Sequence, residues 1–313
     1  YTEPDPGFFV SLDDTRSGRF IVISAHDHET SECWLIPAHT PETAPICVAP
    51  RTTGIEYELD DDAAQDRLML VTNWSPDGQA EDFLVAHAPV PSADADHSSW
   101  QVIRPHTPGC LVLDAVPFSN HIVYLLRENA LPRIIIETKV TGAIAAIEFG
   151  EEAYDLALGA MGQYDTNTLR FPYASMTTPM QTTDYDMDTR ARILRKSQNV
   201  PSGHDPADYV TRRISATSHD GAKVPVSVVY HRDTPLDSSA PVLLYGYGAY
   251  GITIPASFSV TRLSLVERGF IYAIAHIRGG KARGHNWFMQ GRGAKKTNSF
   301  KDFAAAARAL IAR

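Results

Sequence analysis

The stretch GRFIVISAHDHETSECWLI, residues 18–36, contains the pattern that decides the fold. Two apolar runs, residues 20–23 and 33–36, lie on either side of a polar turn at residues 26–29. Short runs of β-branched and aromatic residues separated by turn residues are typical of an antiparallel strand pair. The stretch has no 3.6-residue periodicity, so it predicts a hairpin and not a helix.

The same pattern recurs three more times before residue 194. The further copies occupy residues 66–85, 120–136 and 154–171. Four such units, at a loose period of about 35 to 55 residues, match the blades of a β-propeller, in which each small sheet buries its faces against its neighbours. Because propellers have about four to eight blades, the units either close a ring or belong to a larger one. An irregular β-sandwich is the alternative.

The composition changes after the fourth unit. Residues 199–210 are rich in proline, glycine and polar residues and predict a linker between propeller blades at 1–198 and a second domain at 211–313. Residues 215–230 predict a hairpin around an Asp-Gly turn. Residues 242–275 read as buried strand, helix and buried strand, which predicts a βαβ unit with a parallel sheet.

The last segment predicts a helix over residues 298–313, without a Gly or Pro stop signal. Ser299 and Asp302 are expected to form its capping box. The preceding pair Lys295-Lys296 is expected to stay solvated. The apolar stripe of this helix is expected to face the core, and its members are Phe300, Phe303, Ala304, Ala307, Leu310 and Ile311.

Composition and charge exclude several classes of protein. Of the 313 residues 43% are hydrophobic, and the formal net charge is −9, which disfavours a nucleic-acid partner. No run of about eighteen apolar residues exists, so no membrane span is expected. Cys33, Cys47 and Cys110 form neither a disulfide framework nor a CxxC zinc motif, and a reducing cytoplasm is the expected compartment. The chain starts at Tyr1, without a signal peptide, and is expected to be an internal fragment.

The segment YGYGAYG, residues 245–251, carries the most chemistry. It follows the first buried strand of the βαβ unit, where open α/β sheets place ligand sites. Its glycines permit a tight turn, and a phenol on such a loop can stabilise an oxyanion. The alternative is that the tyrosines only pack a domain interface.

With two later segments, AHIRGG at 275–280 and KKTNSFKDF at 295–303, this loop resembles the prolyl oligopeptidase family of serine peptidases in order and spacing. Upstream segments resemble the oligopeptidase B branch of that family. They are YASMTTP at 173–179, DMDT at 186–189 and VPVSVVYH at 224–231.

The resemblance implies part of a seven-bladed propeller covering the N-terminal part of an α/β-hydrolase domain with a Ser-Asp-His triad. No G-x-S-x-G nucleophile motif occurs in the sequence. The serine, aspartate and histidine are therefore expected outside this chain, which alone should be inactive and prone to aggregate. The implied substrates are short peptides, with no cofactor and no metal. The remainder of its own polypeptide is the other expected partner.

The resemblance assigns two residues. Tyr247 corresponds to the side-chain oxyanion donor, and Tyr250 to the aromatic wall of the primary specificity pocket. Cleavage after Arg or Lys is implied by the branch alone, because the acidic residues that bind a basic primary side chain are expected downstream of this chain. Pro255 and Ser257 stand where the branch often has two acidic residues that favour a second basic residue beside the primary one, so that subsite is in doubt. A prolyl-specific peptidase is the alternative enzyme. A non-catalytic propeller binding module is the alternative if the native chain ends here.

Other polar clusters are set aside. The pairs His204-Asp205 and His219-Asp220 say little about contacts in space. The acidic run 60–62 is expected to be a solvated loop, and Ser227 is expected to be a poor nucleophile because it lies within a strand. His26 and His28 lack a third metal ligand nearby and are expected to sit in a solvated turn.

Overall fold

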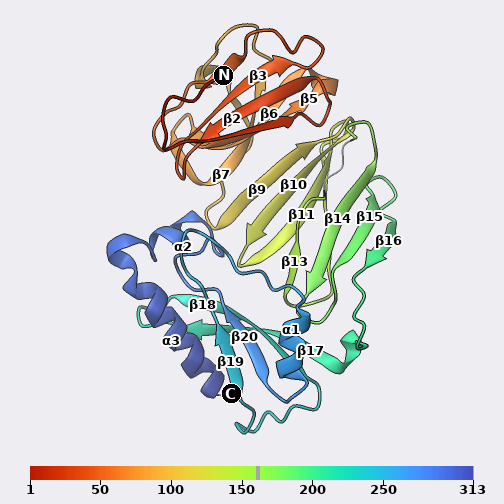
Figure 1. Ribbon diagram of the computed structural model, residues 1–313, viewed down its shortest axis with the longest axis vertical. Helices are drawn as coiled ribbons and strands as arrows, with labels where there is room; N and C mark the ends of the chain where they lie inside the picture. Colours follow the sequence, from red (N-terminus) through yellow and green to blue (C-terminus); the bar gives the residue numbers. More distant parts are fainter. Residues whose placement is uncertain (160–162, 313) are drawn as a thin grey trace.

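The computed structural model describes residues 1–159 and 163–312, and their strands form five four-stranded sheets. Four sheets follow one another along the chain as blades 1 to 4 and fill the upper part of Figure 1, with the fifth sheet below them. Each blade is antiparallel throughout. The four-unit prediction is confirmed, although residues 160–162 of the fourth unit lie outside the described part.

The blade strands have the following bounds. Blade 1 holds β1 (Phe9–Asp14), β2 (Phe20–His26), β3 (Ser31–Pro37) and β4 (Ile46–Ala49); blade 2 holds β5 (Tyr57–Asp62), β6 (Arg67–Ser75), β7 (Gly78–Pro89) and β8 (Gln101–Arg104). Blade 3 holds β9 (Cys110–Pro117), β10 (His121–Glu128), β11 (Leu131–Thr138) and β12 (Ala143–Ala146); blade 4 holds β13 (Tyr154–Leu156), β14 (Thr168–Ser175), β15 (Gln181–Asp186) and β16 (Arg192–Ser197).

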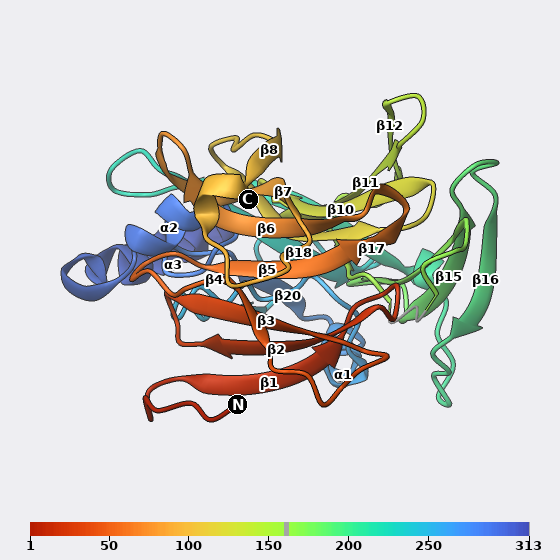
Figure 2. The ribbon, with the colours of Figure 1, turned by 90° about the horizontal axis from the view of Figure 1, so that it is seen from above.

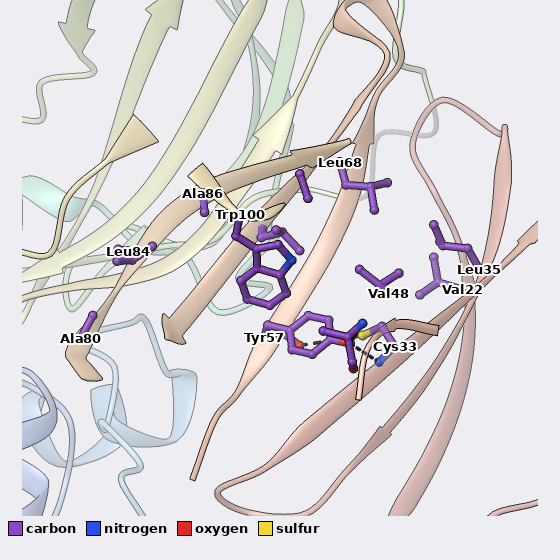
Figure 3. Packing of buried hydrophobic residues seen from close by; sticks show 13 residues of the cluster. Val22, Cys33, Leu35, Val48, Tyr57, Leu68, Ala80, Leu84, Ala86 and Trp100 are labelled. Carbon is purple, nitrogen blue, oxygen red and sulfur yellow. Dashed lines mark hydrogen bonds between the residues drawn. The ribbon is translucent and has the colours of Figure 1, made fainter. Parts of the chain in front are cut away.

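Apolar side chains fill the space between neighbouring blades. Figure 2 shows the strands of blades 1 and 2 lying sheet against sheet, and Figure 3 shows the core between them. Tyr57 is the polar centre of this core: its hydroxyl donates to the Ala49 carbonyl (2.7 Å) and accepts from the Cys33 amide (2.7 Å). Burial also raises the pKa of the Cys33 thiol to about 12, so this thiol stays protonated.

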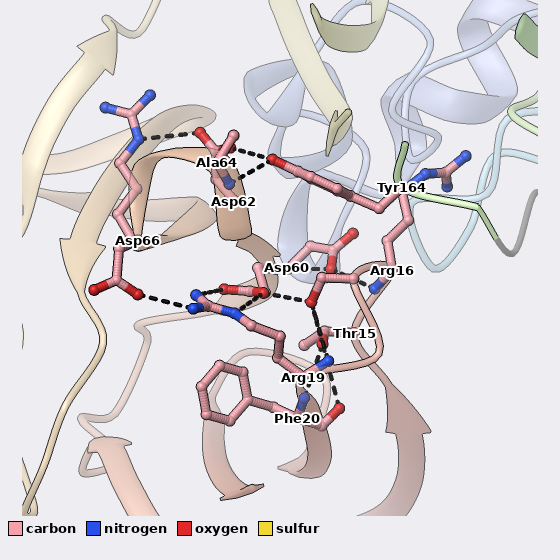
Figure 4. A network of polar contacts seen from close by, with 12 residues as sticks. Thr15, Arg16, Arg19, Phe20, Asp60, Asp62, Ala64, Asp66 and Tyr164 are labelled. Carbon is pink, nitrogen blue, oxygen red and sulfur yellow. Dashed lines mark hydrogen bonds and ion pairs between the residues drawn. The ribbon is translucent and has the colours of Figure 1, made fainter. Parts of the chain in front are cut away.

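The acidic run at the end of β5 is buried, and its prediction as a solvated loop is wrong. Asp61 and Asp62 have no exposed surface. Asp61 accepts from both Nε (2.8 Å) and Nη2 (2.7 Å) of Arg19 in blade 1. Figure 4 shows Arg19, Asp62 and Tyr164 in this network of polar contacts. Asp62 accepts from Tyr164 (2.8 Å) and from the ammonium of Lys139 in blade 3. The run therefore links neighbouring blades by charge, through partners far away in the sequence.

Two outer strands leave apolar side chains uncovered. On β1, Phe9 is 60% and Leu12 70% exposed, and on β16 Ile193 and Leu194 are both more than half exposed. These side chains are the apolar surface behind the expectation that the chain aggregates on its own.

The fifth sheet, called the hydrolase sheet here, has the strand order β17-β18-β20-β19. Strands β17 (Tyr209–Thr217) and β18 (Lys223–His231) form the expected hairpin. The strands β19 (Val242–Tyr245) and β20 (Ile271–Ala275) pair in parallel, and α1 (Val260–Val266) lies in the connection between them, which confirms the βαβ unit.

Helices cover both faces of the hydrolase sheet. Alternate residues of β20 point to opposite faces: Tyr272 and Ile274 pack with Val266 of α1, whereas Ala273 and Ala275 pack with Ala306 of α3 (Thr297–Ile311). The short helix α2 (His285–Met289) lies beside blade 2. Within the described residues, no helix is long and apolar enough to cross a membrane.

The prediction for α3 is wrong at its start and only partly right for its buried face. No side chain caps the helix, because Ser299 and Asp302 both bind Arg278 instead. Phe303 and Leu310 of the expected stripe pack against the core. The buried positions, however, hold small and polar residues, and Phe300 is 64% and Ile311 77% exposed. Residue 313 of the expected helix lies outside the described part.

Candidate active site

Two loops meet at the carboxyl edge of the hydrolase sheet. Because β19 and β20 are parallel neighbours, the segments that follow them emerge at the same edge. We call residues 245–251 the tyrosine loop and residues 276–281 the arginine loop. The amide of Gly251 donates to the Gly279 carbonyl (3.0 Å), and the amide of Lys281 donates to the Gly251 carbonyl (2.9 Å). These bonds join the two loops into one unit.

Backbone meets backbone where the loops cross. Gly248 has φ +66°, and a Cβ on it would lie 2.6 Å from the side chain of Ile277. A Cβ on Gly279 would lie 2.1 Å from the Gly248 carbonyl oxygen, and one on Gly291 would lie 2.2 Å from the Gly279 nitrogen. No side chain fits at these positions, so the approach of the loops depends on glycine.

The structure places both sequence-predicted site tyrosines on the tyrosine loop with their rings accessible. Tyr247 is 44% and Tyr250 80% exposed, and Tyr250 adopts φ +54°, which is uncommon for a residue other than glycine. An exposed phenol on a rigid loop can donate a hydrogen bond to a developing oxyanion. The roles of the two residues stay predictions.

A buried ion pair lies beneath the loops. Arg278 is 4% exposed and binds Asp302 of α3 through Nε (2.8 Å) and Nη2 (2.6 Å), while its Nη1 reaches Asp220 at 2.5 Å. The hydroxyl of Ser218 donates to the same Asp302 carboxylate (2.6 Å). The hydrogen bonds from Arg278 lower the pKa of Asp220 to about 2, so the Asp220 carboxylate stays charged at neutral pH.

Lys296, which directly precedes α3, and Ser299 in its first turn both contact the loops. The ammonium of Lys296 donates to the carbonyl oxygen of Gly248, and the hydroxyl of Ser299 donates to the carbonyl oxygen of Arg278 (2.6 Å). The expectation that Lys296 stays solvated is therefore wrong, whereas its neighbour Lys295 is exposed. Sequence reasoning missed this role, although the spacing of Lys296, Ser299 and Asp302 on one helical face was visible.

One serine and one histidine touch inside the hydrolase sheet. The hydroxyl of Ser227 lies 2.9 Å from Nε2 of His276, but Ser227 is only 1% exposed. Burial, together with the nearby Arg213 and Arg127, lowers the pKa of His276 to about 3. A substrate cannot reach this pair, which fits the view of Ser227 as a poor nucleophile.

The remaining candidates are engaged elsewhere. His204 Nε2 lies 2.6 Å from the Thr177 carbonyl oxygen, and His219 Nδ1 is 4.0 Å from Asp220. In the part of the chain that the structure describes, no group of three or more His, Cys, Asp or Glu side chains could hold a metal ion.

Comparisons with known proteins agree with this geometry. The family profile described as prolyl oligopeptidase, N-terminal beta-propeller domain, matches residues 1–198, and the profile of the prolyl oligopeptidase family matches residues 256–313. The chain belongs to the prolyl oligopeptidase family, and its fold is a set of propeller blades followed by part of an α/β-hydrolase domain.

Particular relatives are similar over nearly the whole chain. Dipeptidyl aminopeptidase BI of Pseudoxanthomonas mexicana is 36% identical over 97% of this chain and 41% of its own length. Protease 2 of Moraxella lacunata is 30% identical over 99% of this chain and 43% of its own. The structure of oligopeptidase B from Leishmania major matches with a TM-score of 0.90 at 30% identity, over 100% of this chain and 44% of that one. The chain thus spans less than half the length of these relatives.

Proposed function

We propose that residues 1–313 belong to a serine oligopeptidase that hydrolyses short peptides through an acyl-enzyme, with the nucleophile on a part of the polypeptide outside these residues. The observation that carries the proposal is the exposed phenol of Tyr247 on the tyrosine loop, held at the carboxyl edge of the hydrolase sheet by the arginine loop. A side-chain oxyanion donor requires such a placement.

The chemistry assigned to this chain is stabilisation and binding. When the serine attacks the scissile carbonyl, negative charge develops on the carbonyl oxygen, and the hydroxyl of Tyr247 donates a hydrogen bond to it together with a backbone amide. Loss of such a donor raises the barrier by about 2.7–4 kcal/mol. Tyr250, which is 80% exposed, lines the pocket for the substrate side chain next to the scissile bond.

We propose a cytoplasmic location, because the three cysteines are free and form no disulfide framework. For the substrate, we propose cleavage after Arg or Lys in short peptides. The support is the likeness to oligopeptidase B, including the enzyme from Trypanosoma brucei solved with covalently bound antipain, which matches with a TM-score of 0.89 at 32% identity. Pro255 and Ser257 provide no carboxylate after the tyrosine loop. Selectivity for a second basic residue should therefore be weak.

A second candidate is removal of dipeptides from free N-termini. It is favoured by the 36% identity to a protein named dipeptidyl aminopeptidase. The two candidates differ in whether the substrate must present a free α-amino group.

The first experiment combines the intact mass of the purified protein with labelling by a fluorophosphonate probe. A mass well above 34.4 kDa and one labelled serine are expected. A mass of 34.4 kDa without label would overturn the enzyme proposal and favour a propeller binding module.

The second experiment defines the substrate with fluorogenic peptides. Matched peptides with Arg, Lys or Pro before the scissile bond are compared with blocked and with free N-termini. Faster cleavage after Arg and Lys in the blocked peptides supports the oligopeptidase B-like proposal. Cleavage after Pro supports a prolyl peptidase, and a strict need for a free N-terminus supports the dipeptidyl peptidase.

A third experiment tests the site itself. Tyr247→Phe should lower kcat about 100-fold or more by removing the donor, and Tyr245→Phe, on the same loop, is the matched control. Equal effects of the two changes would contradict the role of Tyr247.

A further inference from the structure

We propose that Lys296 is a positioning residue for the oxyanion donor, because it fixes the backbone of the tyrosine loop directly after Tyr247. This inference rests on the proposed function. It assigns Lys296 no contact with substrate, so its effect on the reaction passes through Tyr247.

The contact that carries the proposal joins a side chain to a backbone atom. The Lys296 ammonium donates to the carbonyl oxygen of Gly248, the residue that follows Tyr247. A charged donor makes a stronger hydrogen bond than a neutral one. With φ of Gly248 at +66° and its carbonyl held, the peptide that joins Gly248 to Ala249, one residue beyond Tyr247, has little freedom to rotate.

Among the described residues, one other group, the Ser299 hydroxyl, lies within hydrogen-bond distance of the Gly248 oxygen. The Ser299 hydroxyl is 3.5 Å from the Gly248 oxygen and only 2.6 Å from the Arg278 oxygen, so it serves mainly the arginine loop. Because Gly279 has no Cβ, its backbone can lie close to the Gly248 oxygen, but it donates no hydrogen bond to that oxygen. Lys296 therefore supplies the main restraint on this carbonyl.

The surroundings of the ammonium indicate that backbone binding is its purpose. Among the described residues, no carboxylate oxygen lies within 4.0 Å of the Lys296 ammonium. A lysine without an ion-pair partner is normally solvated, because its ammonium is strongly hydrated. Here the side chain is half-buried and turned toward the loop.

Lys295 is the matched control that the chain itself offers. It ends the turn Gly293–Lys295, precedes Lys296 directly and is exposed. A change of charge at position 295 alters the local field almost as much as one at position 296, but it removes no contact with the tyrosine loop. The pair therefore separates positioning from general electrostatics.

The experiment measures kcat and KM of the full-length polypeptide carrying K296M, K295M, Y247F or Y247F together with K296M. We expect K296M to lower kcat at least 10-fold with KM changed less than 3-fold, and K295M to leave both within 2-fold. Because Lys296 acts through Tyr247, the double variant should be at most about 3-fold slower than Y247F alone. K296R, which keeps a charged donor, should recover part of the rate.

Two kinetic results would each overturn the proposal: an unchanged kcat in K296M, or a kcat loss in the double variant equal to the product of the two single losses. If K296M does not fold, K296Q replaces it, and thermal melting of each variant identifies that case.

A readout without activity separates this proposal from the proposed function. Hydrogen exchange of the amides of residues 246–251 should speed up in K296M and not in K295M. If the wild-type protein cleaves no peptide, the proposed function fails while exchange still reports on the restraint. Equal exchange in K296M and wild type would mean that Lys296 does not hold the loop.

Discussion

The hydrolase sheet meets the propeller along two contacts that differ in chemistry. Beside blade 4, Ala153 and Met176 pack against Val266 and Tyr272 in one buried apolar cluster. Beside blades 1 and 2, the contacts are polar: Glu29 in a turn of blade 1 and Asp82 within β7 of blade 2 bind the segment that contains α2. When apolar surfaces separate, the free energy gained by their burial is lost. Polar groups that separate can bind water instead, so the net free-energy cost is low. We expect the second contact to open more readily.

The polar contact is centred on Asp82 at the start of blade 2's second long strand, β7. Its carboxylate accepts from the amides of His285 (2.5 Å) and Gly109 (2.6 Å) and is 4% exposed. Gly284, at φ +88°, permits this approach, because a Cβ there would lie 2.3 Å from the carboxylate. The turn between β10 and β11 of blade 3 adds a further contact: the amide of Ala130 donates to the carbonyl of Ala282 (2.7 Å), and the Ala130 side chain joins the apolar core of the hydrolase sheet.

The largest expected effect is on the apolar side. Met176→Ala should lower the free energy of unfolding by about 2–5 kcal/mol, because it leaves a cavity between blade 4 and the hydrolase sheet. Met180, which is 41% exposed, provides the control M180A, expected to change stability by less than about 0.5 kcal/mol. Denaturant unfolding of the full-length polypeptide measures both, and equal losses would break the comparison.

The second largest effect is expected at Asp82, the centre of the polar contact. Asp82→Ala leaves two part-buried amides, those of His285 and Gly109, without their acceptor, at a cost of about 1–3 kcal/mol. We expect faster hydrogen exchange in residues 280–292 and little change in the blade 4 contact. Asp77→Ala, on the exposed turn of the same hairpin, should alter neither. Faster exchange on both sides would show that the two contacts open together.

A pH effect should appear on the hydrolase side. The pKa of His276 is lowered to about 3 in the fold by burial, Arg213 and Arg127, whereas an unfolded histidine has a pKa near 6.5. Below about pH 6.5 the unfolded state therefore binds more protons, and stability falls as the pH falls. Between pH 6 and 5 this group should remove about 1 kcal/mol. In H276N the pH slope should flatten, and an unchanged slope would assign it to other groups.

The smallest effect is expected for the exposed pair between Arg292 and Glu29. Both side chains are about half exposed, so Glu29→Gln should cost less than about 1 kcal/mol and the difference should vanish in high salt. A larger, salt-independent loss in thermal melting would show that this pair is part of the permanent contact.

Local sequence patterns predicted the strands of the blades, but they did not predict contacts between residues far apart in the sequence. The turns at residues 26–29 and 75–78 are built from residues whose preferences act over a few positions, and the strands they join were predictable. Asp61 and Asp62 looked like a solvated run because Arg19, Lys139 and Tyr164 lie about 40 to 100 residues away. No local rule reports such a partner.

The candidate site shows the same limit. The tyrosine loop could be placed from its glycines and the preceding buried strand, and family resemblance supplied the roles of Tyr247 and Tyr250. Ser299 and Asp302 fitted a capping-box pattern, but they bind Arg278. Lys296 reads as a surface lysine until the fold brings Gly248 beside it.

The glycine contacts between the loops also set rules for recombining relatives. Gly248, Gly279 and Gly291 meet backbone to backbone without room for any side chain, and Lys296 closes the same unit from α3. A chimera with a crossover between residues 251 and 276 would combine loops that had adapted to different partners. Crossovers before residue 245 or after Asp302 keep the unit intact and should yield far more folded, active hybrids.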